Sequence, residues 1–158
     1  MVEVCGGISR TGVTMLNGEA VEIAGVGFAG ICGFGGGFGR RKLNAWGESL
    51  IEQFVPESII HAIRFEQALV KLQTDRKIVV LHYSPIRATL HGEDPEIYAF
   101  LGSSRLEEPI NRFRATAVFH GHAHNGITDG KTSTGIPVYN VSAPVLHKTG
   151  KPYRIVEL

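Results

Sequence analysis

A chain of 158 residues is long enough to bury a hydrophobic core and corresponds in length to one domain. Hydrophobic residues make up 43% of it and charged residues 20%, which is ordinary globular usage and argues against intrinsic disorder. The net charge of +1 gives no clear signal for nucleic acid, and the one tight basic cluster, Arg40-Arg41-Lys42, is interpreted as a solvated turn.

The two cysteines, Cys5 and Cys32, form neither a disulfide framework nor a Cys-x-x-Cys pair. This usage favours a reducing compartment. No apolar run approaches the roughly 18 residues that a membrane span requires, and the first residues lack the pattern of a secretory signal. The sequence therefore predicts a cytoplasmic protein with no membrane partner.

The first predicted elements are strands. Residues 13–16 and 20–23 are apolar runs on either side of Asn17-Gly18, a dipeptide typical of tight hairpin turns because both residues tolerate positive φ. Residues 26–31 continue the apolar pattern after Gly25. Together these segments predict a β-meander with its first turn at Asn17-Gly18.

A glycine-rich segment, residues 33–39, follows the predicted strands. It resembles a phosphate-cradling loop but matches neither of the common phosphate-binding motifs. A tight loop packed against other backbone is therefore the favoured interpretation, with a loop flanking a ligand as the alternative.

The rest of the chain alternates between helical and strand patterns. A helix is predicted from Glu48, interrupted at Pro56, and resumed with apolar residues three or four apart between Glu57 and Gln73. The later predicted elements are a buried strand at 78–81, a helix at 103–113, a buried strand at 115–119, and strands at 137–141 and 153–156. This order predicts a single mixed α/β (α+β) domain over residues 1–158, with a crossover between the two buried strands.

Both buried strands end in histidine. The first runs into Leu81-His82-Tyr83-Ser84-Pro85 and the second into His120-Gly121-His122-Ala123-His124. Ligand sites in α/β sheets form beyond the carboxyl ends of the strands, so two neighbouring strands would bring these imidazoles together. Neutral imidazole suits zinc, iron, manganese or copper, and the cluster therefore predicts a metal site.

These histidine motifs resemble the last two motifs of the calcineurin-like metallophosphoesterases. The stretches GFGGGFGR, LHYSPI, LGSSRLEEPI and VFHGHAHNG extend the likeness over most of the chain. The resemblance implies a partial β-sandwich flanked by helices, corresponding to the C-terminal two-thirds of such a domain. It also implies hydrolysis of a phosphomonoester or phosphodiester at a centre of two divalent metal ions, Mn, Fe or Zn.

The resemblance assigns roles to individual residues. It implies that His82 and His122 bind one metal and that His124 binds the other. His120, with Gly121, falls outside the ligand pattern and is expected to support the loop around the site. Separately, Ser104 and Arg105 lie at a predicted helix start, where an arginine and backbone amides would suit an anion. Substrate binding is one interpretation of this pair, and an ordinary helix cap is the favoured one.

The chain departs from the family in what it lacks. Complete members carry D-x-H, Gly-Asp and Gly-Asn-His motifs, and none of the three occurs in this sequence. No family acid or base is identifiable without them. We therefore expect a fragment or split subunit that binds metal weakly and turns over little by itself. We also expect exposed strand edges, which favour self-association or pairing with a separate N-terminal half.

Two other interpretations remain open. The chain could be a non-catalytic metal-binding or assembly module derived from the same fold. It could also carry a structural zinc site built from His82, His122 and His124, although such sites usually include cysteine and a fourth donor.

Overall fold

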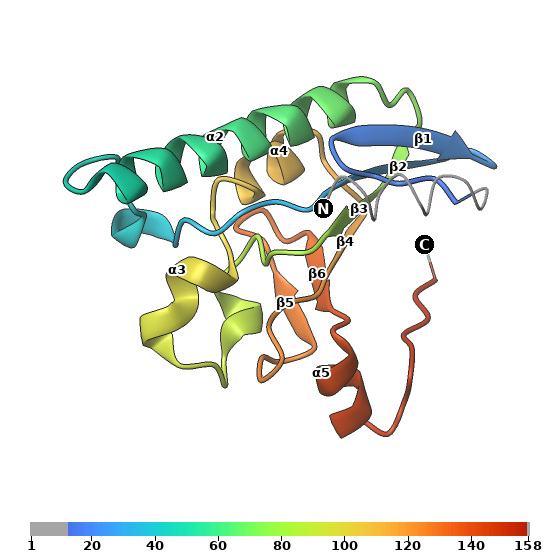
Figure 1. Cartoon of the computed structure of the whole chain (residues 1–158). Coiled ribbons are helices and arrows are strands. Elements are labelled where there is room, and N and C mark those ends of the chain that lie inside the picture. The colour runs from blue at the N-terminus through green and yellow to red at the C-terminus, as the bar shows by residue number, and fades with distance from the viewer. Residues whose placement is uncertain (1–12, 158) are drawn as a thin grey trace.

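The computed structural model describes residues 13–157, which form a six-stranded mixed sheet with helices beside it (Figure 1). The strands are β1 (Glu19–Ile23), β2 (Val26–Ile31), β3 (Arg76–Leu81), β4 (Ala117–His120), β5 (Asp129–Lys131) and β6 (Pro137–Asn140). The helices are α2 (Ser49–Val70), α3 (Tyr98–Leu101), α4 (Glu107–Arg112) and α5 (Ala143–Lys148), with short 3-10 turns η1 (Gly39–Arg41), η2 (Ala88–Leu90) and η3 (Pro95–Ile97). The predicted mixed α/β class is confirmed.

The sheet has a parallel centre and antiparallel edges. Its strand order is β1-β2-β3-β4-β6-β5, in which β2, β3, β4 and β6 are parallel neighbours. The edge strands β1 and β5 pair antiparallel with β2 and β6. These strands form one sheet, so the described residues contain a single layer rather than the two layers of a sandwich. The carboxyl ends of the four parallel strands lie at one edge.

The predicted hairpin was misplaced. The turn between β1 and β2 lies at Ala24-Gly25, where both residues have positive φ and Ile23 pairs with Val26. Asn17-Gly18 instead precedes β1, and the amide of Gly18 donates to the carbonyl of Gly30. The predicted meander is also wrong, because only β1 and β2 form an antiparallel pair and the other neighbour of β2 is the parallel strand β3. The segment 13–16 forms no strand.

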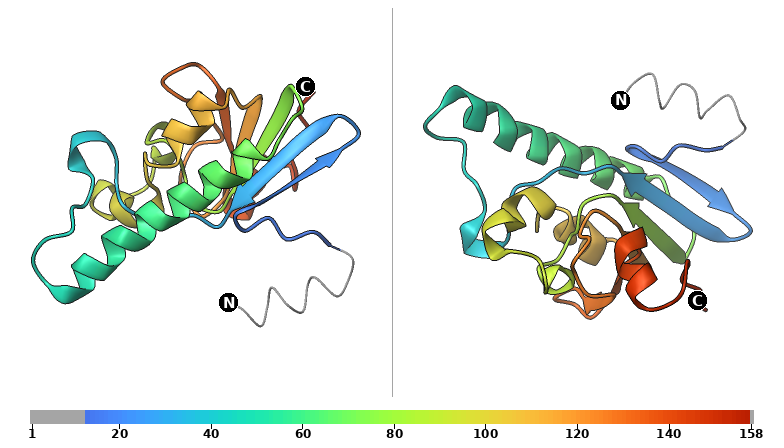
Figure 2. Two further views of the ribbon diagram at one scale, coloured as in Figure 1. Left: turned by 90° about the horizontal axis from the view of Figure 1, so that it is seen from above. Right: turned by 60° about the horizontal axis from the view of Figure 1, so that its bottom comes forward.

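Helix α2 is the longest helix, and Pro56 does not interrupt it. A proline within a helix leaves the carbonyl four residues earlier without its donor. Pro56 and Glu52 are both exposed, so water can satisfy that carbonyl. Figures 1 and 2 show α2 running across one side of the molecule, where Phe65 and Leu69 are fully buried against the sheet.

Two later predictions also changed. The helix predicted over 103–113 is shorter, because residues 102–104 pair with other backbone before α4 begins at Glu107. The strand predicted at 153–156 is not formed, and this segment instead runs alongside the sheet after α5 (Figure 2). The crossover between β3 and β4 is confirmed by their parallel pairing. No helix within residues 13–157 is long and apolar enough to cross a membrane.

Candidate histidine site at the carboxyl edge of the sheet

The two histidine motifs meet at the carboxyl edge of the sheet. Leu81 pairs with His120 in register, so His82 and Gly121 leave the two strands side by side. The amide of Gly121 donates to the carbonyl of His82, at 3.2 Å. The juxtaposition that the sequence predicted for these strand ends is present.

The rings of His82 and His122 are in contact. Their centroids lie 4.6 Å apart at an interplanar angle of 47°, and the ring of Tyr83 lies 4.6 Å from that of His122 on another side. His122 has φ of +65°, a left-handed conformation that non-glycine residues seldom adopt. This turn after Gly121 directs the ring back toward β3. Strain of this kind is often found at functional sites.

The charge state of His82 suits a ligand role. Partial desolvation lowers its pKa, and the nearby rings of His122 and His124 lower it further. Metal ligation requires an unprotonated ring nitrogen, and a lowered pKa keeps the imidazole neutral at physiological pH. His124 is close enough to lower the pKa of His82 although its own side chain is exposed.

The described donors do not complete a metal site. Across residues 13–157, no three His, Cys, Asp or Glu side chains converge so that they could hold an ion. The Nε2 of His122 also lies 3.2 Å from the carbonyl oxygen of Phe100, and this ring would have to release that contact to bind a metal. The residues supply a pair of imidazoles, to which further ligands would have to be added.

His120 lies inside the fold, with only 1% of its surface exposed. Its Nδ1 is 2.8 Å from the carbonyl of Gly121, which can only accept, so this nitrogen carries the proton. Nε2 then accepts from the hydroxyl of Thr89 at 2.9 Å. Burial lowers the pKa of His120 to about 4, against the opposing effect of the bond to Gly121. These contacts give His120 the geometry of a loop support.

Three polar residues that the sequence interpretation missed hold the two motifs in place. Thr89 joins His120 to Ser84 of the first motif, with 2.9 Å between the two hydroxyl oxygens. Asn140 Nδ2 and Ser142 Oγ both donate to the carbonyl of Ala123, at 2.8 and 3.0 Å. Asn140 lies near the carboxyl end of the predicted strand 137–141, and that position could have indicated it. Thr89 has no comparable signal in the sequence.

Ser104 and Arg105 contact the glycine-rich loop. Ser104 donates its amide to the carbonyl of Gly37, and its hydroxyl accepts from the amide of Gly39. Arg105 Nη2 donates to the carbonyl of Leu43, and burial lowers the pKa of this guanidinium. Both side chains therefore stabilise the loop that precedes α2.

The glycine-rich loop packs closely against the segment that precedes Ser104. A Cβ at Gly35 would lie 2.5 Å from the carbonyl oxygen of Ala99, a separation that Cβ atoms do not tolerate. Gly37 has a φ of +81° and bridges to Ser103. Close backbone packing therefore accounts for the glycines at these positions.

The comparisons with known proteins leave the family open. No protein-family model matches the sequence, and no curated protein matches it. A crystal structure matches over 85% of this chain and 48% of its own, with 17% sequence identity and a TM-score of 0.47. The chain thus spans about half the length of that structure, and a likeness at this level carries no functional argument.

Proposed function

We propose that this chain is a fragment or split subunit of a calcineurin-like, metal-dependent phosphoesterase, acting on a phosphomonoester or phosphodiester in the cytoplasm. The observation that carries the proposal is the contact between His82 and His122, with ring centroids 4.6 Å apart at the ends of adjacent parallel strands. A contact between two sequence motifs about 40 residues apart is what a shared ligand site requires.

The protonation state of His82 supports a metal as that ligand. The pKa of His82 is lowered by partial desolvation and by its histidine neighbours, which keeps a lone pair available for an ion such as Mn²⁺, Fe²⁺ or Zn²⁺. The buried contacts of His120 with Thr89 and Gly121 would fix the loop that carries His122 and His124. Such supporting contacts are typical of metal sites.

The proposal requires groups that this chain does not supply. Imidazoles carry no negative charge, and holding two cations side by side needs carboxylates. The motifs that provide them in complete family members are absent from the sequence. We therefore place the remaining ligands on a separate N-terminal half.

The face of the sheet opposite α2 offers a surface for such a partner. Val80 on this face is 42% exposed, and the rings of Phe119 and Tyr139 are half-buried and pack on each other at 5.3 Å. A second layer on this face would cover apolar side chains that are now open to solvent. It would also turn the single sheet into a sandwich.

A non-catalytic metal-binding or assembly module is the second candidate. The observation that favours it is the lack, among residues 13–157, of any three converging donors. Such a module would retain the scaffold and its contacts without hydrolysing an ester. Metal binding alone does not separate the two candidates, whereas hydrolysis after reconstitution with a partner does.

The experiment measures metal retention and hydrolysis in the same preparations. We expect the chain alone to bind Mn²⁺ weakly in equilibrium dialysis and to hydrolyse bis(p-nitrophenyl) phosphate at close to the background rate. His82→Ala and His122→Ala should each reduce Mn²⁺ retention. The matched control is His147→Ala, which removes an exposed histidine on α5.

Reconstitution supplies the decisive result. Co-expression with a neighbouring reading frame that encodes D-x-H and Gly-Asn-His should restore hydrolysis that depends on His82 and His122. Robust hydrolysis by the unaided chain would contradict the split-site proposal. Equal Mn²⁺ retention by the His82→Ala and His147→Ala proteins would contradict the metal site itself.

A further inference from the structure

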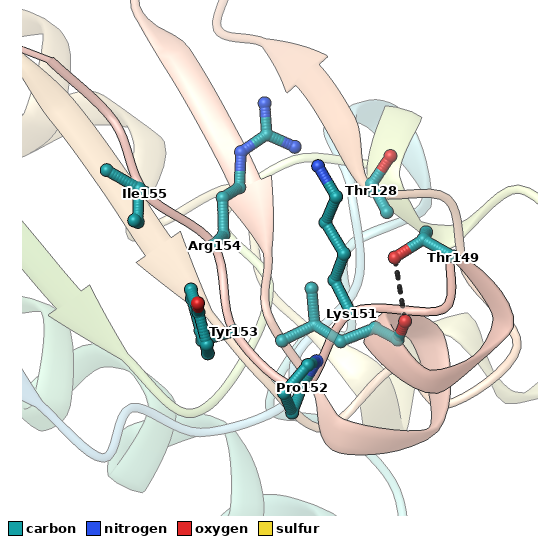
Figure 3. Close-up of a pocket in the computed structure, with 8 residues that line it drawn as sticks. Thr128, Thr149, Lys151, Pro152, Tyr153, Arg154 and Ile155 are labelled. Atoms are coloured by element: carbon teal, nitrogen blue, oxygen red, sulfur yellow. Dashed lines mark hydrogen bonds between the residues drawn. The ribbon is translucent and has the colours of Figure 1, made fainter.

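A cavity lined by the described residues lies away from the histidine pair. It has a volume of about 690 Å³, is open to solvent on one side, and lies between α5, the segment 151–155 and Thr128, which precedes β5 (Figure 3). Small-molecule sites in proteins commonly fall between roughly 300 and 1,000 Å³. The cavity is therefore large enough for a drug-sized ligand.

The side chains that line this cavity are divided into a polar end and an apolar end. Figure 3 shows the Lys151 ammonium and the Arg154 guanidinium directed toward the end where Thr128 lies. Pro152 and the ring of Tyr153 lie at the opposite end. An occupant that satisfies both ends needs a polar group at one end and an apolar body at the other.

The charges at the polar end leave one cation uncompensated. Arg154 is paired with Asp129 through two contacts, Nη2 to Oδ1 at 2.6 Å and Nη1 to Oδ2 at 3.0 Å. The hydroxyl of Thr128 donates to the same carboxylate, whose pKa is held below its usual value by Arg154. Lys151 has no ion-pair partner among residues 13–157. Lys151, Arg154 and Asp129 therefore give the polar end of the cavity a net charge of +1.

The walls of the cavity are held in place without a ligand. The guanidinium of Arg154 lies over the ring of Tyr139 at 4.1 Å, which ties the C-terminal segment to β6 in addition to the ion pair with Asp129. On the other wall, the hydroxyl of Thr149 donates to the carbonyl of Leu146 at 2.7 Å. A ligand would meet a largely pre-formed site, which reduces the entropy lost on binding.

The apolar end is exposed in the chain by itself. Pro152 and Tyr153 lie at this end, and Tyr153 is 63% exposed. An apolar ring or chain laid against them would remove this surface from water and add to the affinity. A free inorganic ion would use Lys151 but leave this end uncovered, so an organic body fits the cavity better.

We propose that this cavity binds a small organic monoanion, a carboxylate or phosphodiester group on an apolar ring or chain. The oxyanion lies against Lys151, and the apolar body lies against Pro152 and Tyr153. The net charge of +1 matches a single negative charge. This site is separate from the histidine pair, and the proposal does not depend on the phosphoesterase function.

The test compares anionic and neutral probes of the same shape. Benzoate, methyl phenyl phosphate and benzamide are titrated into the full chain, with affinity followed by isothermal titration calorimetry and by amide chemical shifts. We expect benzoate to bind at least about tenfold more tightly than benzamide, since a charge-assisted contact contributes roughly that factor. The ratio of the affinities for benzoate and methyl phenyl phosphate then distinguishes a carboxylate ligand from a phosphodiester ligand.

Substitutions locate the binding. Lys151→Met should weaken benzoate binding about tenfold, whereas Lys151→Arg, which keeps the charge, should retain most of it. The matched control is Lys131→Met, which removes an exposed lysine on β5 outside the cavity. Tyr153→Ala should weaken benzoate and benzamide alike, because it removes the apolar contact and leaves the cation.

Three outcomes would overturn the proposal. The first is the absence of saturable benzoate binding to the folded chain. The second is equal affinity for benzoate and benzamide, which would show that the cation plays no part. The third is undiminished benzoate binding in a Lys151→Met protein whose circular dichroism matches that of the parent, which would place the ligand elsewhere.

Discussion

The two faces of the sheet differ in how completely they are covered. On the face beneath α2 and α4, Val79, Val118 and Val138 are each 0% exposed. On the opposite face, the next residue along β3, Val80, is 42% exposed. Successive side chains of a strand point to opposite faces of the sheet. Val79 therefore lies in the buried core, whereas the adjacent Val80 lies on a face that is exposed to solvent.

The covered face stabilises the fold of the chain by itself, whereas the open face is available for binding other molecules. The covered face contains the apolar residues that hold the fold together. The open face is partly crossed by the C-terminal segment, where Arg154 packs on Tyr139 and the 690 Å³ cavity lies. We propose two partners, a complementing half and a small anion. Both are assigned to regions where apolar side chains of this chain are exposed to solvent.

The largest expected effect lies on the covered face. Phe65→Ala should lower the free energy of unfolding by about 3–5 kcal/mol, because it leaves a cavity where a fully buried ring packed between α2 and the sheet. Urea denaturation followed by circular dichroism measures the loss. The matched control is Ile63→Ala on the same helix, which is 49% exposed and should cost less than about 1 kcal/mol. Similar losses of stability for the two variants would contradict the burial of Phe65 and the exposure of Ile63 on α2.

Adjacent valines on β3 compare the two faces directly. Val79→Ala should lower the free energy of unfolding by about 2–3 kcal/mol, since it removes two fully buried methyl groups. Val80→Ala should cost less than about 1 kcal/mol in the isolated chain. If a partner covers the open face, Val80→Ala should instead weaken association, which analytical ultracentrifugation would detect. A large loss of stability for Val80→Ala at low protein concentration would contradict an open face.

The smallest expected effect concerns the attachment of the C-terminal segment. Asp129→Asn should lower the free energy of unfolding by less than about 1 kcal/mol at pH 7, since the Asp129–Arg154 pair is substantially exposed and screened by water. The pKa of Asp129 is lowered in the folded state, chiefly by its hydrogen bonds from Arg154. Its contribution is therefore present above its usual value of 3.8 and is lost as the pH falls through the lower, folded value.

Urea unfolding at several pH values checks this sign. The stability difference between the parent and Asp129→Asn should be constant near neutrality and should disappear in strong acid. The control is Asp75→Asn, which replaces a carboxylate with no ion pair among the described residues. A difference that grows as the pH falls would contradict the role of the pair.

Sequence reasoning identified most elements, and it was wrong where local signals competed. Residues 78–81 and 137–141 were recognisable as strands because their apolar runs are short and bounded by polar or proline residues. The hairpin was misplaced because Asn17-Gly18 is a strong turn dipeptide, whereas the actual turn at Ala24-Gly25 requires an alanine at φ of +50°. Only the pairing of Glu19–Ile23 with Val26–Ile31 makes that turn favourable.

For the candidate site, the sequence by itself determined which histidines would be neighbours. His82 and His120 follow buried strands, and the parallel pairing of those strands places their ends at one edge. The sequence also determined that D-x-H, Gly-Asp and Gly-Asn-His motifs are absent. The first fact follows from the parallel pairing that a crossover connection between the two strands implies, and the second follows from residue order alone.

Only the tertiary structure decided how these residues are used. Burial against Thr89 makes His120 a neutral support, and the positive φ of His122 turns its ring onto His82. The open face beside Val80 and the cavity at Lys151 were likewise beyond the reach of sequence patterns. Each depends on which segments distant in the chain pack together, and free energies of packing and desolvation are properties of the folded arrangement rather than of any short stretch of sequence.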